Sequence, residues 1–189
     1  LNICVDGIIR QNRECKSNNE LANFWNVVSY LQQDGEIFLE SDFRIDYLSG
    51  LKTNKVKDLA FKQPRPILRM RTDRIFMLYK KFSKQVGDTA LPTESLNFYL
   101  ENSKEYLGVQ NSVRFKNILK GVEVTKELEA GGQKYYKKTS VTKQALCFDY
   151  TELMANYNIN LNIDMGMPDE EEEGRDNKPP EDKTSPYKF

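Results

Sequence analysis

The chain has 189 residues, with 28 basic and 28 acidic side chains, no histidine and three cysteines. Without histidine, a Ser-His-Asp triad, a Cys-His dyad and a histidine-ligated zinc or haem site are excluded. Cys4, Cys15 and Cys147 are widely spaced, which argues against a disulfide framework or a Cys-x-x-Cys metal site. The apolar runs are far too short for a membrane helix. We therefore expect a reduced, cytoplasmic protein with no membrane partner.

The zero net charge is an average over blocks of opposite sign. Residues 52–84 carry 11 basic and 2 acidic side chains, residues 113–143 carry 8 and 3, and residues 164–189 carry 4 and 9. The last block has almost no large aliphatic residue after Met167, so it cannot bury enough apolar area to offset the entropy of ordering. This predicts a disordered acidic C-terminal tail at 164–189. The first residue is leucine, and we expect the chain to be a fragment of a longer protein.

Residues 1–71 are predicted to form a helix and β-hairpin unit, which a degenerate winged helix would also describe. A capping box over residues 17–20 begins a helix that ends at Gly35. Period-two alternation over residues 37–47 then predicts two strands joined by a turn at Ser41-Asp42. Another strand is expected over Ile67–Arg71. The helix carries an apolar stripe at helical spacing, formed by Leu21, Phe24, Trp25, Val28 and Leu31.

Residues 72–163 repeat the order of helices followed by strands. Thr72 is expected to cap a helix that ends at Gly87, and a second helix is expected from about Leu91 to Ser103. Strands are predicted over Ser112–Leu119 and Lys138–Phe148, with a basic, glycine-containing loop between them. A last helix is expected after an Asp149 cap. This order predicts an α+β fold whose second part, 72–163, is a winged helix-turn-helix domain.

The motifs of common enzymes are missing from the sequence. No G-x-x-x-x-G-K-[ST] phosphate loop occurs, and Gly131-Gly132-Gln133-Lys134 lacks its spacing and its hydroxyl residue. The carboxylates of Asp42 and Asp46 would share a strand face, where solvated side chains are more common than a two-metal site. We expect no cofactor, no metal and no catalytic residue, and therefore no enzymatic activity in this chain.

Basic side chains, interleaved with two tyrosines, form the most informative cluster. Arg and Lys neutralise phosphates, and aromatic rings stack on unpaired bases. Lys52, Lys55, Lys57 and Lys62 belong to the same basic block, and Lys126 flanks the wing. The nucleic-acid-binding residues predicted on this basis are Arg65, Arg69, Arg71, Arg74, Lys80, Lys81, Lys84, Arg114, Lys116, Lys134, Tyr135, Tyr136, Lys137 and Lys138. An ordinary solubilising surface is the alternative interpretation of the same charges.

The second helix of the presumed helix-turn-helix is acidic. Glu94 and Glu101 lie on it, Glu105 follows, and only Lys104 opposes them. Such a helix would be repelled by the major groove, so backbone contacts through the wing and the Arg74 helix are expected, with little sequence preference.

Several stretches of the chain resemble the C-terminal region of mobile-element and phage primase–helicases. They are residues 24–31, 42–47, 74–79, 96–100, 105–108 and 145–150. In that family a ring-forming helicase of the superfamily-three type is followed by a winged-helix tail, and the catalytic residues lie upstream. The resemblance implies an accessory DNA-binding module, contacting single-stranded or forked DNA and the helicase or primase part of the same parent chain. A protein-interaction module that docks on the helicase ring or a replication partner is the alternative.

Overall fold

The computed structural model describes residues 2–161, with side chains from residue 18 onward. The tail predicted at residues 164–189 lies outside the described residues. The helices are α1 (Asn2–Gln33), α2 (Thr72–Gln85), α3 (Thr93–Glu101) and α4 (Tyr150–Tyr157). The strands are β1 (Phe43–Leu51), β2 (Leu59–Arg71), β3 (Tyr106–Lys116), β4 (Ile118–Leu119), β5 (Val122–Glu123), β6 (Thr125–Ala130), β7 (Gln133–Lys138) and β8 (Ser140–Asp149). The predicted α+β class is confirmed.

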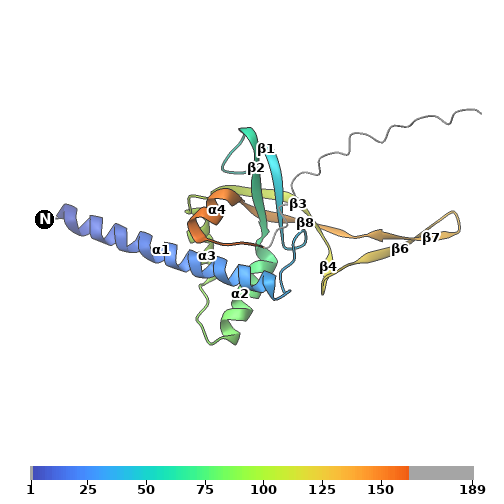
Figure 1. The fold of residues 1–189 in the computed structure, drawn as a ribbon, viewed down its shortest axis with the longest axis horizontal. Coiled ribbons are helices and arrows are strands. Elements are labelled where there is room, and N and C mark those ends of the chain that lie inside the picture. The colour runs from blue at the N-terminus through green and yellow to red at the C-terminus, as the bar shows by residue number, and fades with distance from the viewer. Residues whose placement is uncertain (1, 162–189) are drawn as a thin grey trace, which may run out of the picture.

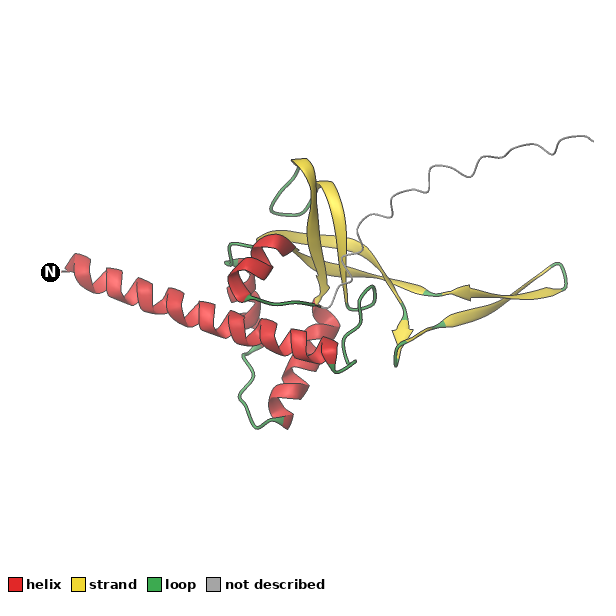
Figure 2. Cartoon of the chain, viewed as in Figure 1, coloured by secondary structure: helices red, strands yellow, loops and turns green. Residues whose placement is uncertain are grey.

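A four-stranded antiparallel sheet in the order β1-β2-β8-β3 forms the body, and the helices gather on one side of it (Figure 2). Alternate residues of the strands face the helices, as the period of two requires. Phe148 of β8 pairs with Leu68 of β2 and meets the ring of Trp25 at 5.3 Å. Phe24 packs edge-on against Tyr79 at 5.2 Å. The core therefore joins α1 and β2 to α2 and β8. The boundary expected after residue 71 falls between β2 and α2, and both of these elements contribute side chains to the same core.

The two outer strands of this sheet are also tied to each other. Arg44 on β1 donates to the carbonyl of Arg114 on β3 at 2.8 Å. In the loop between β1 and β2, Thr53 donates to the carbonyl of Leu107 at 2.6 Å, and Asn54 N–H donates to the carbonyl of Val109 at 3.0 Å. The sheet therefore curls so that its side away from the helices encloses a second small core of Leu51, Ile67 and Cys147.

The local signals predicted the later helices well. α2 and α3 occupy the expected ranges, and Asp149 caps α4 by accepting from the N–H groups of Thr151 (3.1 Å) and Glu152 (3.3 Å). The predicted cap at Thr72 was wrong, because Thr72 is the first helical residue and no side chain caps α2. β8 confirms the strand predicted at 138–148, whereas β3 begins at Tyr106, earlier than predicted.

Two predictions for the N-terminal part were wrong. α1 runs without a break from Asn2, so the capping box at residues 17–20 begins no helix. The hairpin turn is not at Ser41-Asp42, because β1 pairs with β2 and the connection is residues 52–58. Asp42 instead lies fully buried in a tight loop, where its carboxylate accepts from the N–H of Phe38 at 2.9 Å. Ile37 is buried as a loop residue, and this burial produces the apolar alternation.

Within residues 2–161, no helix combines the length and the apolar character needed to cross a bilayer.

Candidate nucleic-acid interface

Two hairpins leave the body beyond the ends of β3 and β8 (Figure 1). β4 and β5 are joined by Lys120-Gly121, with φ of 50° and 79°, and β6 and β7 by Gly131-Gly132, with φ of 62° and 78°. Positive φ at both central residues is the type I′ pattern, whose twist matches that of paired strands. Both connections are therefore short turns that hold their strands in register.

The two hairpins share one root. The backbone N–H of Val124 donates to Asn117 at 2.8 Å, and that of Thr139 donates to Val124 at 2.8 Å. The carboxylate of Glu123 pairs with Lys138 and, at 3.6 Å, with Lys116. The hydrogen bond from Lys138 is the main reason that the pKa of Glu123 is lowered. We call this pair of hairpins, residues 118–138, the fork.

One face of the β6–β7 hairpin carries no acidic residue. Lys126 lies opposite Lys137 and Leu128 lies opposite Tyr135, and residues directly opposite each other point to the same side. Both lysines are exposed, and among the described residues neither has an ion-pair partner. Like charges placed opposite each other repel, so this face favours an anion. We call Lys126, Leu128, Tyr135 and Lys137 the acid-free face.

The opposite face of the same hairpin is charge-balanced. It carries Glu127, Glu129, Lys134, Tyr136 and Lys138. Lys134 pairs with Glu127 at 2.7 Å, and Lys138 pairs with Glu123 at the root. Of the predicted wing residues, Tyr135 and Lys137 thus lie on the acid-free face, whereas Lys134, Tyr136 and Lys138 lie on the balanced one.

The predicted arginines of β2 and α2 are all bound to carboxylates. Arg65 pairs with Asp149 at 3.4 Å, Arg69 with Asp46 at 2.7 Å, Arg71 with Asp73 at 3.0 Å, and Arg74 with Asp42 at 2.7 Å. The hydrogen bond from Arg71 is the main cause of the lowered pKa of Asp73. Burial raises the pKa of Asp42, against the opposing effects of the Phe38 N–H and Arg74. These pairs tie strands and helices together and neutralise much of the basic block.

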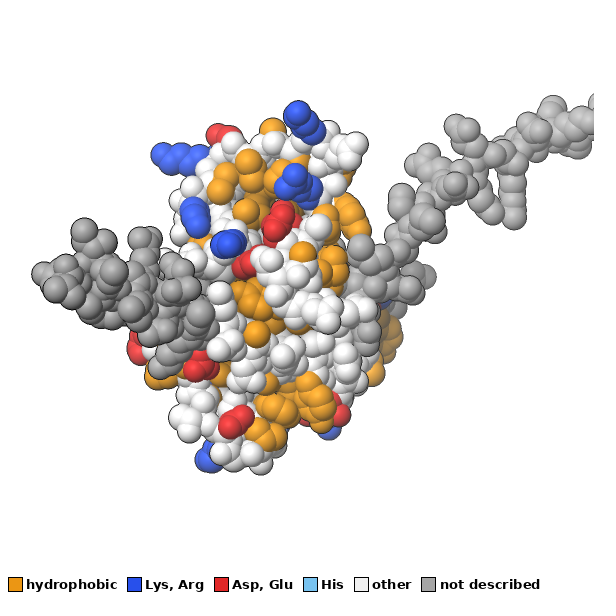
Figure 3. Space-filling view, turned by 60° about the vertical axis from the view of Figure 1, so that its left-hand side comes forward, with side chains coloured by type: hydrophobic (Ala, Val, Ile, Leu, Met, Phe, Trp, Pro, Cys, Tyr) orange, Lys and Arg blue, Asp and Glu red, His pale blue; other side chains and the backbone are white. Residues whose placement is uncertain are grey.

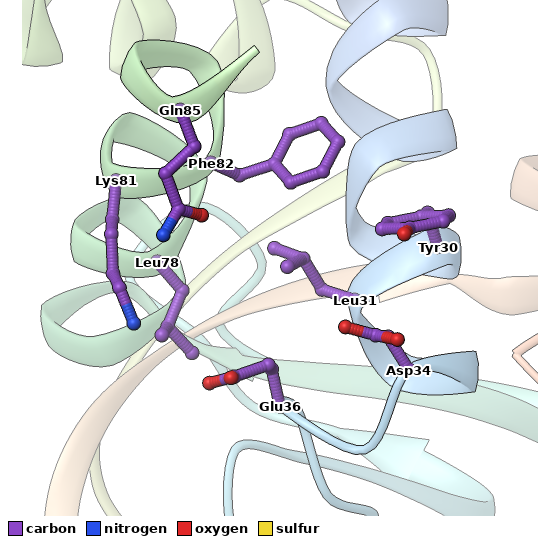
Figure 4. A pocket seen from close by; sticks show the side chains of 8 residues that line it. All are labelled: Tyr30, Leu31, Asp34, Glu36, Leu78, Lys81, Phe82 and Gln85. Atoms are coloured by element: carbon purple, nitrogen blue, oxygen red, sulfur yellow. The ribbon is translucent and has the colours of Figure 1, made fainter.

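The predicted lysines of α2 lie on the helical side of the molecule, away from the fork (Figure 1). Lys80 donates to the hydroxyl of Thr93 at the start of α3. Lys81 lines a pocket between the end of α1 and α2, which the carboxylates of Asp34 and Glu36 also line (Figure 4). Lys84 is exposed. An acidic neighbourhood of this kind makes the pocket a poor phosphate site.

The two predicted residues of β3 lie near the fork, but their side chains bind other residues of the chain. Arg114 donates to the hydroxyl of Ser140 at 2.7 Å, and Lys116 belongs to the root through Glu123. The fourteen predicted residues therefore occupy several separate places: the arginine–carboxylate ion pairs, the α2 helix, the root with the end of β3, and the β6–β7 hairpin.

A further basic surface lies at the end of the β1–β2 hairpin, where Figure 3 shows Lys and Arg side chains gathered. Lys52, Lys55, Lys57 and Lys62 are exposed there, and the ammonium of Lys55 lies 5.1 Å from the ring centre of Tyr106. This surface and the acid-free face belong to different hairpins.

Helix α3 presents a surface of the opposite character. Phe98 is 62% exposed, and Glu94 and Glu101, which lie about one turn before and after it, are exposed as well. The acidity expected for this helix is therefore on its solvent side, surrounding an apolar ring.

Comparisons with protein-family models, with curated proteins and with solved structures give no match to this chain. In the part of the chain that the structure describes, no cluster of three or more Cys, Asp or Glu side chains could hold a metal ion. The thiol of Cys147 is buried, which raises its pKa to about 12.

Lys126 and Leu128 of the acid-free face are not among the fourteen residues predicted from the sequence. Over residues 125–130 the acids alternate with Lys126 and Leu128, and that period of two was the signal. The sequence predicts a loop for these residues, whereas the structure has strand β6 there.

Proposed function

We propose that this chain is a winged-helix nucleic-acid-binding module that contacts the phosphate backbone with little sequence preference, as an accessory part of a replicative primase–helicase. The acid-free face is the observation that carries the proposal. It combines two lysines that have no ion-pair partner among residues 2–161 with a ring that is 48% exposed, Tyr135. Lysines supply sequence-independent attraction to phosphates, and an exposed ring offers a stacking platform for an unpaired base.

The connectivity of the body supports the winged-helix description. A winged helix has a strand, a helix-turn-helix pair, and then two strands joined by a wing. Here β2 is followed by α2 and α3, then β3, the fork and β8, and the strands lie in the order β2-β8-β3. β1 adds one outer strand to this arrangement. The β6–β7 hairpin then takes the position of the wing.

The acidity of α3 supports binding at the wing and not at the helix-turn-helix. In a helix-turn-helix the second helix enters the major groove, but exposed Glu94 and Glu101 would meet phosphates there with the wrong sign. The acid-free face has no such conflict.

A fluorescence-anisotropy titration with labelled single-stranded DNA at several salt concentrations tests this function. We expect micromolar or tighter binding that weakens as salt rises. Replacing both Lys126 and Lys137 with alanine should weaken binding at least about tenfold and reduce the slope of log K against log salt by about 1.4, two single-strand phosphate contacts. Replacing Lys52 and Lys57 removes the same charge from the β1–β2 end and is the matched control. Absent or salt-independent binding, or an equal loss in both variants, would refute the proposal.

A protein-interaction module is the second candidate, and the exposed ring of Phe98 on α3 favours it. An apolar ring between two carboxylates suits a partner with an apolar pocket and a basic rim. If α3 docks on the helicase ring or another replication protein, Glu94→Lys with Glu101→Lys should weaken assembly in a pull-down with that part of the parent chain. The Lys126 and Lys137 variant should leave such assembly intact.

A further inference from the structure

The β4–β5 hairpin ends in an exposed aliphatic tip. Leu119 is 59% exposed and Val122 is 70% exposed, and they are paired across the turn. The turn residues between them are Lys120 and Gly121, so the tip is apolar with one positive charge and no acid. A solvated turn ordinarily carries polar side chains, and none of the core clusters of the described residues includes these two.

The tip lies close to the loop that follows α1, and an ion pair joins its hairpin to the root. A Cβ at Gly121 would lie 3.7 Å from the ring of Phe38, so the loop after α1 supports the turn from one side. At the other end, Glu123 locks the hairpin to Lys116 and Lys138. A supported apolar projection can keep its position when it is pressed against a flat ligand.

The tip and the acid-free face are adjacent along the chain and diverge from the same root (Figure 1). Only Glu123 and Val124 separate Val122 from the start of β6. A polynucleotide strand bound along Lys126, Tyr135 and Lys137 would therefore reach the tip where the chain leaves the β6–β7 hairpin.

We propose that Leu119 and Val122 form a wedge that packs on the last base pair of a duplex at a junction with single-stranded DNA, while the acid-free face holds the released strand. Apolar side chains pack on the faces of bases at the end of a stack, and the surrounding positive charge attracts the phosphates on both sides. The occupant of the tip is thus a terminal base pair. This proposal rests on the proposed function, because the β6–β7 hairpin must bind the strand.

Binding of the full chain to a labelled forked DNA, a blunt duplex and a single strand of equal length tests the wedge. The unaltered chain should bind the forked DNA about tenfold more tightly than the single strand. Leu119→Ser with Val122→Ser should remove this preference and leave single-strand binding unchanged. Tyr136→Ser, an exposed ring on the balanced face, is the control and should keep the preference. The fluorescence of a 2-aminopurine in the terminal pair should change when the unaltered chain binds and not when the tip variant binds.

The outcomes separate the two proposals. If the unaltered chain binds no DNA, the proposed function and the wedge are both overturned. Two results would overturn the wedge alone. One is salt-dependent single-strand binding with no preference for forked DNA. The other is a tip variant that binds forked DNA as well as the unaltered chain does. A chain that self-associates in sedimentation, and loses that association in the tip variant, would show that the tip docks on a second copy, which also overturns the wedge.

Discussion

The curl of the sheet requires that residue 108, a glycine, has no side chain. Gly108 lies on β3 with φ of 122°, beside the loop that joins β1 to β2. A Cβ there would lie 2.6 Å from the side-chain oxygen of Asn54 and 2.9 Å from the Cβ of Thr53, and closer still to the hydroxyl of Thr53. Gly108→Ala is therefore expected to push this loop off the strand.

The cost has two parts. A non-glycine residue at this φ costs about 1–3 kcal/mol. Displacing the loop also breaks the bond from Thr53 to the carbonyl of Leu107 (2.6 Å) and the bond from the N–H of Val109 to Asn54 (2.5 Å). Each of these hydrogen bonds contributes about 1 kcal/mol net. We expect Gly108→Ala to lower the free energy of unfolding by about 4 kcal/mol.

Urea unfolding followed by the fluorescence of Trp25 measures this change, because the chain has one tryptophan and it is 1% exposed in the core. Gly87→Ala is the matched control, since Gly87 has φ of 77° but nothing within 4 Å of its Cβ position. It should lose only the backbone part, about 1–2 kcal/mol. If the two variants lose equal stability, the steric reasoning about the loop is wrong.

Two further predictions concern the core. Arg74→Ala leaves the fully buried carboxylate of Asp42 without its cation, so it should lower the free energy of unfolding by about 3 kcal/mol at pH 7. Burial already raises the pKa of Asp42, so protonation of this carboxyl favours the folded state. Urea titrations should therefore show a smaller loss of unfolding free energy near pH 4.5 than at pH 7. A loss that grows as the pH falls would contradict this assignment. The fragment 72–163 alone should show no cooperative unfolding by circular dichroism, because it lacks β2, one of the two strands that pair with β8, and the ring of Trp25; a sharp urea transition would show instead that it is an independent domain.

Local signals account for what the sequence could predict of the fold. α2 to α4 are short helices whose apolar spacing lies within the helix itself, and the Asp149 cap acts on residues two and three positions away. The pairing of β2 with β8 joins segments far apart in the chain, and no local pattern contains it. The false hairpin at Ser41-Asp42 has the same origin, because Ile37 is buried in the tertiary core as a loop residue and not by a strand partner.

The basic block illustrates the same difference at the candidate site. Counting charges along residues 52–84 predicts a phosphate-binding surface, but the counterions of three of its four arginines come from outside the block: Asp42 and Asp46 precede it and Asp149 follows it. Only Asp73 lies inside the block. Charge density in the sequence therefore measures the supply of cations, while the fold decides how many of them face solvent.

The smaller block at residues 113–143 is the more informative one for this reason. A two-stranded hairpin that projects from the body has no core to satisfy, so its side chains are sorted only by the alternation of the strands and by their cross-strand neighbours. Alternation places both acids of β6, Glu127 and Glu129, on one face and leaves Lys126 and Lys137 together on the other. Because repulsion between those two lysines is not relieved within the described residues, an anion bound beside them would stabilise the hairpin. The proposed binding therefore predicts that the affinity for a polyanion falls with any change that separates the two strands.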